Sequence, residues 1–403
     1  MCIFAVGNLK RTVMDITLTA YMEGQLQQTV STFHRYMYSQ VSWQSRMFGL
    51  VGPRGVGKST MILQYIKEHR AEGRMFYVSA DHIYFATHTL VDLVDEFARE
   101  GGGQIFIDEI HKYANWSREL KQIYDTHPDV KVGFTGSSVL DIYKGQADLS
   151  RRAPIFMMQG LSFREYLMLF HGVDVPVYGL DEILEHRATL PSISHPLPLF
   201  HDYLNRGYYP FSGESDFELR LRQVINQTME VDIPQYANMT ASTGRKLKKL
   251  LAVVARSVPF KPVMDTVAAV VGVSRNVLPD YFLYMEQAGM IGQLRDDTGG
   301  IRGVGKVEKV YIDNPNLAYL LGADGTDIGN VRETFFYNQM RVTTDVISSR
   351  NGDFEIAGKT FEVGGRKKGK KQIKDIAEGY VVKDDIEFGS GNIIPLWAFG
   401  LTY

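Results

Sequence analysis

The sequence predicts an α/β fold in which a parallel sheet comes first and smaller helical and mixed α/β parts follow. Two observations predict the sheet. Short apolar runs alternate with helix-length segments between residues 47 and 156, and a glycine-rich loop directly follows the first apolar run. Strands that alternate with helices form parallel sheets covered on both faces. The ends of such strands meet along one edge of the sheet, where ligands bind.

The apolar runs are MFGLVG, MFYVSA, QIFIDE and VKVGFTGS, and the segments between them include STMILQYIKEH and LVDLVDEFARE. We assign residues 46–160 to this sheet domain. Residues 1–45 precede it and are expected to be a mostly helical segment, because apolar side chains recur there at spacings of three to five residues. They are Tyr21, Leu26, Val30, Phe33 and Met37.

Three further parts are expected after the sheet. Residues 161–243 are predicted to be a helical lid or linker, with a loop at the proline-rich LPSISHPLPLF. Residues 244–322 contain three helical segments and then two strand-like runs around a glycine-rich turn, the order of a winged helix-turn-helix. Ser274 is the expected N-cap of the third helix, and Gly289 follows its end. Residues 323–403 are predicted to be a small α/β domain.

The composition excludes some classes of protein. The chain has 403 residues and a net charge of −2, which argues against a globally basic nucleic-acid binder but leaves room for a local basic patch. Its one cysteine, Cys2, cannot form an internal disulfide. No apolar run approaches the ~20 residues of a membrane span, and the basic residues near the start follow the apolar run, the reverse of a secretory signal. We expect a cytoplasmic protein with no membrane partner.

The glycine-rich loop has the spacing of a phosphate-binding loop and lies between a strand and a helix, as that motif requires. Glycines let successive backbone N–H groups converge on an anion, and the helix N-terminus adds partial positive charge. Lys58 is expected to bind the β- and γ-phosphates of ATP, and Ser59 to bind Mg²⁺. The alternative is a plain glycine turn, which the full spacing and both flanking elements disfavour. The residues of the loop are Gly52, Pro53, Arg54, Gly55, Val56, Gly57, Lys58, Ser59 and Thr60.

A pair of acids ends the strand QIFIDE. Asp108 is expected to hold Mg²⁺, and Glu109 to polarise a water for attack on the γ-phosphate. Acids at a strand end are common, but this pair follows the phosphate loop by about fifty residues and lies in the right place in the alternation. His111, two residues further on, could sense the nucleotide, but a surface position where a helix begins is the favoured expectation.

Hydroxyls end the strand VKVGFTGSS. Thr135, Ser137 or Ser138 could hydrogen-bond the γ-phosphate or the attacking water, and a capped turn explains any one of them nearly as well. Further on, Arg151 and Arg152 could reach the γ-phosphate bound by a neighbouring subunit, as an arginine finger does in a homo-oligomer. A solvated surface pair is the alternative for the two arginines.

Taken together, GPRGVGKST, QIFIDEIHKYANW, GFTGSS, the arginine pair before QGLSFREYL and the later RGYYPF resemble the predicted prokaryotic AAA+ superfamily ATPases that carry a C-terminal domain of unknown function, DUF4143. Archaeal-type ATPases are related to them. The resemblance covers the chain from about residue 30 to the end. It implies a helical part and a winged helix after the ATPase core, and a last domain that resembles restriction-type nucleases. It also favours Arg152 over Arg151 as the finger.

The last domain departs from the nuclease pattern. Such nucleases hold a metal with an acid and a strand bearing Glu-x-Lys. Glu333, Asp353 and Glu362 are the acids available here, but Gly364 stands where the lysine is needed. We therefore expect a degenerate domain without nuclease activity.

The target of the ATPase stays open between two classes. Residues 245–309 carry eleven Lys and Arg against six Asp and Glu, so the predicted winged helix could bind the phosphates of double-stranded DNA. Its third helix, however, offers only Arg275 and Asn276 for reading bases, and the aromatic residues that follow are typical of a core. The alternative is a nucleotide-gated switch that binds an unknown protein partner, turns over slowly and does not touch DNA.

Overall fold

The computed structural model describes residues 14–136, 149, 151–256, 262–297, 305–322, 325–369 and 371–403. Contacts divide the chain into two compact units. The first comprises residues 1–51, 58–137 and 141–158, and the second comprises residues 52–57, 138–140 and 159–403. Within the described ranges, no helix has the length and apolar character that crossing a membrane requires.

The first unit contains the predicted parallel sheet. Its five strands lie in the order β2-β3-β4-β1-β5, and every neighbouring pair is parallel. The four apolar runs form four of these strands, as predicted. β4, which carries Thr135, lies between β1, which leads into the glycine-rich loop, and β3, which ends at Asp108. The strands are β1 (Met47–Val51), β2 (Met75–Ser79), β3 (Gln104–Asp108), β4 (Lys131–Gly136) and β5 (Ile155–Met157).

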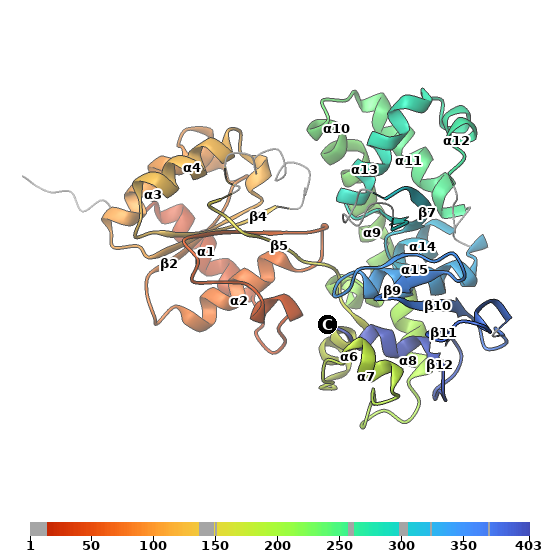
Figure 1. The fold of residues 1–403 in the computed structure, drawn as a ribbon. Coiled ribbons are helices and arrows are strands. Elements are labelled where there is room, and N and C mark those ends of the chain that lie inside the picture. Colours follow the sequence, from red (N-terminus) through yellow and green to blue (C-terminus); the bar gives the residue numbers. More distant parts are fainter. Residues whose placement is uncertain are drawn as a thin grey trace, which may run out of the picture. The chain divides into compact units, whose positions relative to one another are not determined.

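Helices cover both faces of this sheet. In Figure 1, α3 (Leu90–Arg99) and α4 (Trp116–Thr126) lie on one side of it and α2 (Lys58–His69) on the other. α1 (Ile16–Gln28) packs against α2 and the edge strand β2, where the sulfur of Met22 accepts a hydrogen bond from the Tyr77 amide at 3.3 Å.

The N-terminal helix is shorter than predicted. It ends at Gln28, Thr29 is already extended, and Val30 is 64% exposed. The residues that follow, TVST, combine β-branched side chains with serine, all of which favour helices less than the preceding segment does. A single 3₁₀ turn at Tyr36–Ser39 is the only further helical element before β1 in the described part of this segment.

The long segment of the second unit, residues 159–403, begins with helices. Part of the proline-rich segment predicted as a loop is helical, because proline is tolerated in the first turn of a helix and α8 carries its prolines there. The helices of this region are α6 (Phe163–His171), α7 (Leu180–Leu184), α8 (Leu197–Asp202), α9 (Phe217–Gln227) and α10 (Ile233–Tyr236), with a π-helical turn at Tyr203–Gly207 between α8 and α9.

The three predicted helices and two strands follow. Ser274 caps a 3₁₀ turn at Arg275–Val277, where its side chain accepts a hydrogen bond from the Asn276 amide, and not α13 itself, whose N-cap is Val277. Gly289 after the helix has a φ of 69°. The strands pair antiparallel. The order of elements agrees with a winged helix, and that assignment stays a prediction. The elements are α11 (Ala241–Arg256), α12 (Met264–Val271), α13 (Leu278–Gln287), β6 (Ile291–Arg295) and β7 (Val307–Ile312).

A second five-stranded sheet ends the chain, in the order β12-β11-β10-β9-β8. Its strands β10, β11 and β12 are parallel, and β8 and β9 pair antiparallel. One cluster of buried apolar side chains runs from Phe163 to Leu401, so the three C-terminal parts share a core, and the boundaries drawn between them stay predictions. The elements are α14 (Pro315–Gly322), α15 (Ile328–Met340), β8 (Ile347–Ser348), β9 (Phe354–Ile356), β10 (Lys359–Gly364), β11 (Gly379–Lys383) and β12 (Ile393–Pro395).

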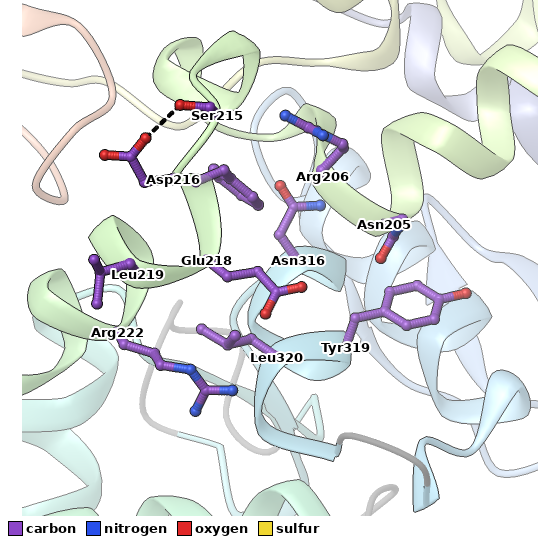
Figure 2. Close-up of a pocket in the computed structure, with 11 residues that line it drawn as sticks. Asn205, Arg206, Ser215, Asp216, Glu218, Leu219, Arg222, Asn316, Tyr319 and Leu320 are labelled. Atoms are coloured by element: carbon purple, nitrogen blue, oxygen red, sulfur yellow. Dashed lines mark hydrogen bonds between the residues drawn. The ribbon is translucent and has the colours of Figure 1, made fainter.

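The second unit contains a pocket of about 680 Å³ between the π-helical turn, α9 and α14 (Figure 2). Two of its polar residues already bind main-chain carbonyls: Arg206 Nε donates to Ser212 at 3.1 Å, and buried Asn316 donates to Tyr203 and Leu204. The remaining polar lining is mostly exposed, and we assign no chemistry to this pocket. Its lining residues are Asn205, Arg206, Ser215, Asp216, Phe217, Glu218, Leu219, Arg222, Asn316, Tyr319 and Leu320.

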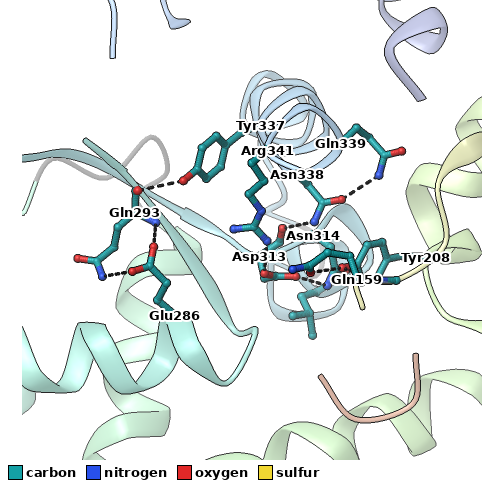
Figure 3. A network of polar contacts seen from close by, with 12 residues as sticks. Gln159, Tyr208, Glu286, Gln293, Asp313, Asn314, Tyr337, Asn338, Gln339 and Arg341 are labelled. Atoms are coloured by element: carbon teal, nitrogen blue, oxygen red, sulfur yellow. Dashed lines mark hydrogen bonds and ion pairs between the residues drawn. The ribbon is translucent and has the colours of Figure 1, made fainter. Parts of the chain in front are cut away.

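A buried polar network joins the end of β7 to α15 (Figure 3). Asp313, whose side chain is 2% exposed, forms an ion pair with Arg341, and its main-chain oxygen accepts from Asn338 at 2.8 Å. Gln339 donates to Asn338 at 2.9 Å and to the hydroxyl of the C-terminal Tyr403 at 3.2 Å. The network therefore links the hairpin, α15 and the C-terminal segment through groups that burial would otherwise leave without partners.

We predict that Arg341→Met destabilises the protein by about 3–5 kcal/mol, because it leaves the Asp313 carboxylate buried without its cation. Urea unfolding followed by circular dichroism measures the change. The control is Arg187→Met, which removes a 55% exposed guanidinium paired with Glu182 and Glu185 and should change stability by less than about 0.5 kcal/mol. Equal unfolding midpoints for the two variants would contradict the role given to the network.

Candidate nucleotide site

The predicted phosphate loop connects β1 to α2. Gly55 and Gly57 have φ angles of 80° and 97°, which residues with a Cβ rarely adopt, so the sequence needs glycine at both positions. Lys58 is the first residue of α2, and its side chain is buried. Ser59 is partly buried, and Thr60 is exposed. The loop thus has the backbone form predicted for it and leads directly into a helix N-terminus.

The acid predicted to hold metal lies at the end of β3. Asp108 is buried, and both of its carboxylate oxygens accept hydrogen bonds: one from the Thr135 hydroxyl and one from the Tyr77 hydroxyl at 2.7 Å. The Thr135 oxygen accepts in turn from the Glu109 amide at 3.0 Å. One hydroxyl on β4 therefore fixes both residues of the Asp-Glu pair. This is a positioning contact that the sequence did not predict for Thr135.

Glu109 has a left-handed backbone with φ of 51°. A residue other than glycine pays about 1–2 kcal/mol for this conformation, and such positions are frequent at functional sites. The hydrogen bond from its amide to Thr135 offsets part of that cost. His111 Nε2 lies 3.4 Å from Glu109 Oε2, and its side chain is only 4% exposed. The expectation that His111 lies at the surface is therefore wrong, since the turn after β3 folds its ring back toward the glutamate.

Tyr77 is the residue of this site that sequence reasoning missed. Burial raises the pKa of its phenol well above the usual range, and the nearby Asp108 carboxylate raises it further. The neutral hydroxyl is thus a permanent donor to Asp108. The one signal in the sequence was that Tyr77 lies in the apolar run that precedes QIFIDE, since consecutive strands of a parallel sheet are often neighbours.

The donor set at Asp108 fits magnesium. Mg²⁺ prefers oxygen ligands and keeps several waters, and one or two carboxylates suffice to hold it beside phosphate. Asp108 supplies a carboxylate fixed by two hydroxyl donors, and Ser59 supplies a hydroxyl at the start of α2. These residues would hold the ion through oxygen alone.

Arg152 and Ser137 are the remaining residues predicted for catalysis, and the structure describes only Arg152. Arg152 does not extend freely: its guanidinium lies 3.2 Å from Asp125 near the end of α4 and 5.6 Å from the centre of the Tyr124 ring. Ser137 lies outside the residues that the structure describes.

Each of the three acids named in the C-terminal domain pairs with a lysine. Lys309 lies 3.4 Å from Glu333 and 3.1 Å from Asp353, and Lys368 lies 2.5 Å from Glu362. Burial raises the pKa of both glutamates. The two ammonium groups therefore balance charge on the three carboxylates.

Two segments of the chain match known protein families. Residues 44–167 match the AAA_14 family, described as an AAA domain. These residues form an AAA domain. Residues 197–327 match another family, a domain of unknown function named DUF8612, so the resemblance to ATPases that carry DUF4143 stays a prediction. The comparison with curated proteins gives no match.

Solved structures give remote likenesses. A Walker-type ATPase of Pyrococcus abyssi is 13% identical, with 74% of this chain and 99% of that chain covered and a TM-score of 0.46. DnaA of Aquifex aeolicus, solved with AMPPCP bound, is 12% identical, with 62% and 84% covered and a TM-score of 0.25. Likenesses with TM-scores this low add nothing to the family match of residues 44–167.

We predict that Thr135→Val lowers ATP turnover by about 10–100-fold while ATP still binds, because the change removes the hydroxyl that positions both Asp108 and Glu109. Steady-state phosphate release and binding of a fluorescent ATP analogue measure the two effects. Thr135→Ser keeps the hydroxyl and serves as the control, which should retain most of the turnover. If Thr135→Val were as active as Thr135→Ser, the hydroxyl would not be needed to position Asp108 and Glu109 for ATP turnover.

Proposed function

We propose that the chain binds ATP with Mg²⁺ and hydrolyses it. The observation that carries the proposal is the linkage of Asp108, Thr135 and Glu109 at the ends of the adjacent strands β3 and β4. β1, which leads into the phosphate loop, is the next strand of the sheet. Polar side chains of these kinds on neighbouring strand ends are what phosphoryl transfer to water requires.

Each residue then has a role. The loop amides and Lys58 bind the phosphates, while Asp108 and Ser59 hold Mg²⁺, which neutralises charge that develops on the phosphate oxygens. Glu109 accepts the proton of the attacking water, and Thr135 fixes the direction of both acids. Arg152 is proposed to act across a homo-oligomer interface, after leaving Asp125. We also propose a cytoplasmic location.

Glu109→Gln is expected to lower turnover by about 10²–10⁴-fold with ATP affinity kept, because the amide cannot accept the proton of water. Lys58→Ala is expected to weaken ATP binding by about 10–100-fold through loss of charged hydrogen bonds to phosphate. Calorimetry with Mg²⁺ and phosphate release measure the two quantities. Glu72→Gln, an exposed residue of the same unit, is the matched control for charge. Normal turnover in Glu109→Gln would show that another residue is the general base. Unchanged ATP binding in Lys58→Ala would contradict the proposal that this loop binds the phosphates of ATP.

We propose double-stranded DNA as the partner of the second unit, because α11 presents a basic stripe. Arg245, Lys249 and Arg256 are exposed, and their spacings of four and seven residues place them on one side of the helix. None of the three forms an ion pair with a residue that the structure describes. Side chains of this kind bind DNA phosphates without reading sequence.

The residues first considered for DNA contact offer less support. Lys248 pairs with Glu230 at 2.8 Å, and Arg275 pairs with Asp265 at 3.1 Å. Tyr281 and Phe282 are buried, in agreement with a core role. The proposal that the second unit binds DNA therefore depends on the basic stripe of α11. Because such side chains bind phosphates, we expect binding that does not depend on base sequence.

Replacing the three stripe residues with glutamine should weaken binding of a DNA duplex and reduce the slope of log affinity against log salt by about 2–3. Fluorescence anisotropy at several salt concentrations measures both. The control replaces three exposed arginines elsewhere, Arg118, Arg187 and Arg220, with glutamine. If the wild type does not bind DNA and DNA does not alter its turnover, the nucleotide-gated protein switch becomes the favoured function.

For residues 323–403 we propose a nuclease-like scaffold without nuclease activity. The pairing of Lys309 and Lys368 with the three acids supports this, because these cations already balance the charges that would otherwise attract a metal.

A further inference from the structure

His201, Asp384 and Asp385 come together in the second unit from distant parts of the sequence. His201 lies on α8, and the two aspartates directly follow β11. One ligand atom from each of the three residues lies within 4.8 Å of the other two. The cluster shares no residue with the nucleotide site or with the acids paired with Lys309 and Lys368.

In both Asp384 and Asp385, one carboxylate oxygen faces the imidazole of His201 and the second oxygen faces the guanidinium of Arg332. Arg332 donates to Oδ2 of Asp384 at 2.8 Å and to Oδ2 of Asp385 at 3.1 Å. The Oδ1 atoms of the same residues lie 3.5 Å and 3.3 Å from His201 Nε2. Asp384 Oδ1 also accepts from the Asp385 amide at 2.8 Å. Arg332 thus fixes the direction in which both carboxylates face the histidine.

These separations are longer than a good N–H···O bond, which has its optimum near 2.9–3.0 Å. They are the separations of atoms that share an ion: bonds of about 2.0–2.2 Å in a tetrahedral arrangement place two ligands about 3.3–3.6 Å apart. Imidazole with carboxylates is a donor set for first-row divalent transition metals, whereas Mg²⁺ and Ca²⁺ prefer oxygen alone.

Charge and access agree with an ion at this place. The two carboxylates and one guanidinium sum to −1 before His201 is counted, which favours a cation. Asp384 is buried with its side chain 3% exposed, whereas His201 and Asp385 are 45% and 43% exposed, so the cluster opens to solvent. We propose that His201, Asp384 and Asp385 bind one Zn²⁺ ion, with the fourth coordination position left to water. Arg332 is a positioning residue, as outer-shell partners of metal ligands are.

The test uses the full chain, stripped with a chelator and titrated with Zn²⁺ by calorimetry in millimolar Mg²⁺, which occupies oxygen-only sites. One Zn²⁺ per chain is expected, together with the visible absorption of tetrahedral cobalt when Co²⁺ replaces it. His201→Asn and Asp385→Asn should each weaken Zn²⁺ binding at least tenfold and abolish the cobalt absorption. Arg332→Lys should weaken it by about 10–100-fold.

His195→Asn is the matched control, because His195 is exposed and lies 2.9 Å from a single carboxylate, that of Glu387, which cannot complete a site. It should leave Zn²⁺ affinity and the cobalt absorption unchanged. Circular dichroism verifies the fold of each variant, and Asp385→Asn, which keeps the side-chain shape, carries the test if His201→Asn does not fold. No uptake by the wild type, or uptake that neither ligand variant alters, overturns the proposal and leaves the cluster as an ion pair.

Discussion

The hydroxyl of Thr135 is the contact on which the arrangement of the AAA domain depends. It donates to Asp108 and accepts from the amide of Glu109, so one atom contacts both acids. This is possible because β4 lies between β1 and β3, which puts Thr135 beside the acids and on the strand next to the loop. The left-handed backbone of Glu109 persists because its neighbours on two strands fix it.

Much of the AAA domain could be predicted because its signals are local. Apolar runs between amphipathic segments defined β1 to β4, and the glycine spacing defined the loop whose φ angles at Gly55 and Gly57 are positive. The order of the strands was not predictable from these runs, since pairing depends on contacts between residues far apart in sequence. For that reason the sequence did not predict the contacts of Tyr77 and Thr135 with Asp108, and the expected contact of Thr135 with the γ-phosphate or the attacking water stays a prediction.

The C-terminal half shows the limit of such reasoning more clearly. Periodicity predicted α11 to α13, whereas Ser274, the predicted cap of the third helix, caps the 3₁₀ turn that precedes α13. The network around Asp313 and Arg341 joins residues that no local pattern connects, and one core extends across all three predicted parts. Lys309 and Lys368 likewise pair with the acids of the last domain from positions outside the Glu-x-Lys spacing, which only the folded chain reveals.

The sulfur contact between α1 and β2 has a consequence for how copies of this protein can associate. An exposed strand edge is a template for fibril growth, and proteins blunt such edges with coverings or with very short strands. Here α1 packs on β2, where Met22 occupies the Tyr77 amide, and the opposite edge of the sheet is β5, three residues long. Both borders therefore resist the addition of a foreign strand. Any ring or filament of this AAA domain would have to assemble through side-chain surfaces rather than through continuous sheet.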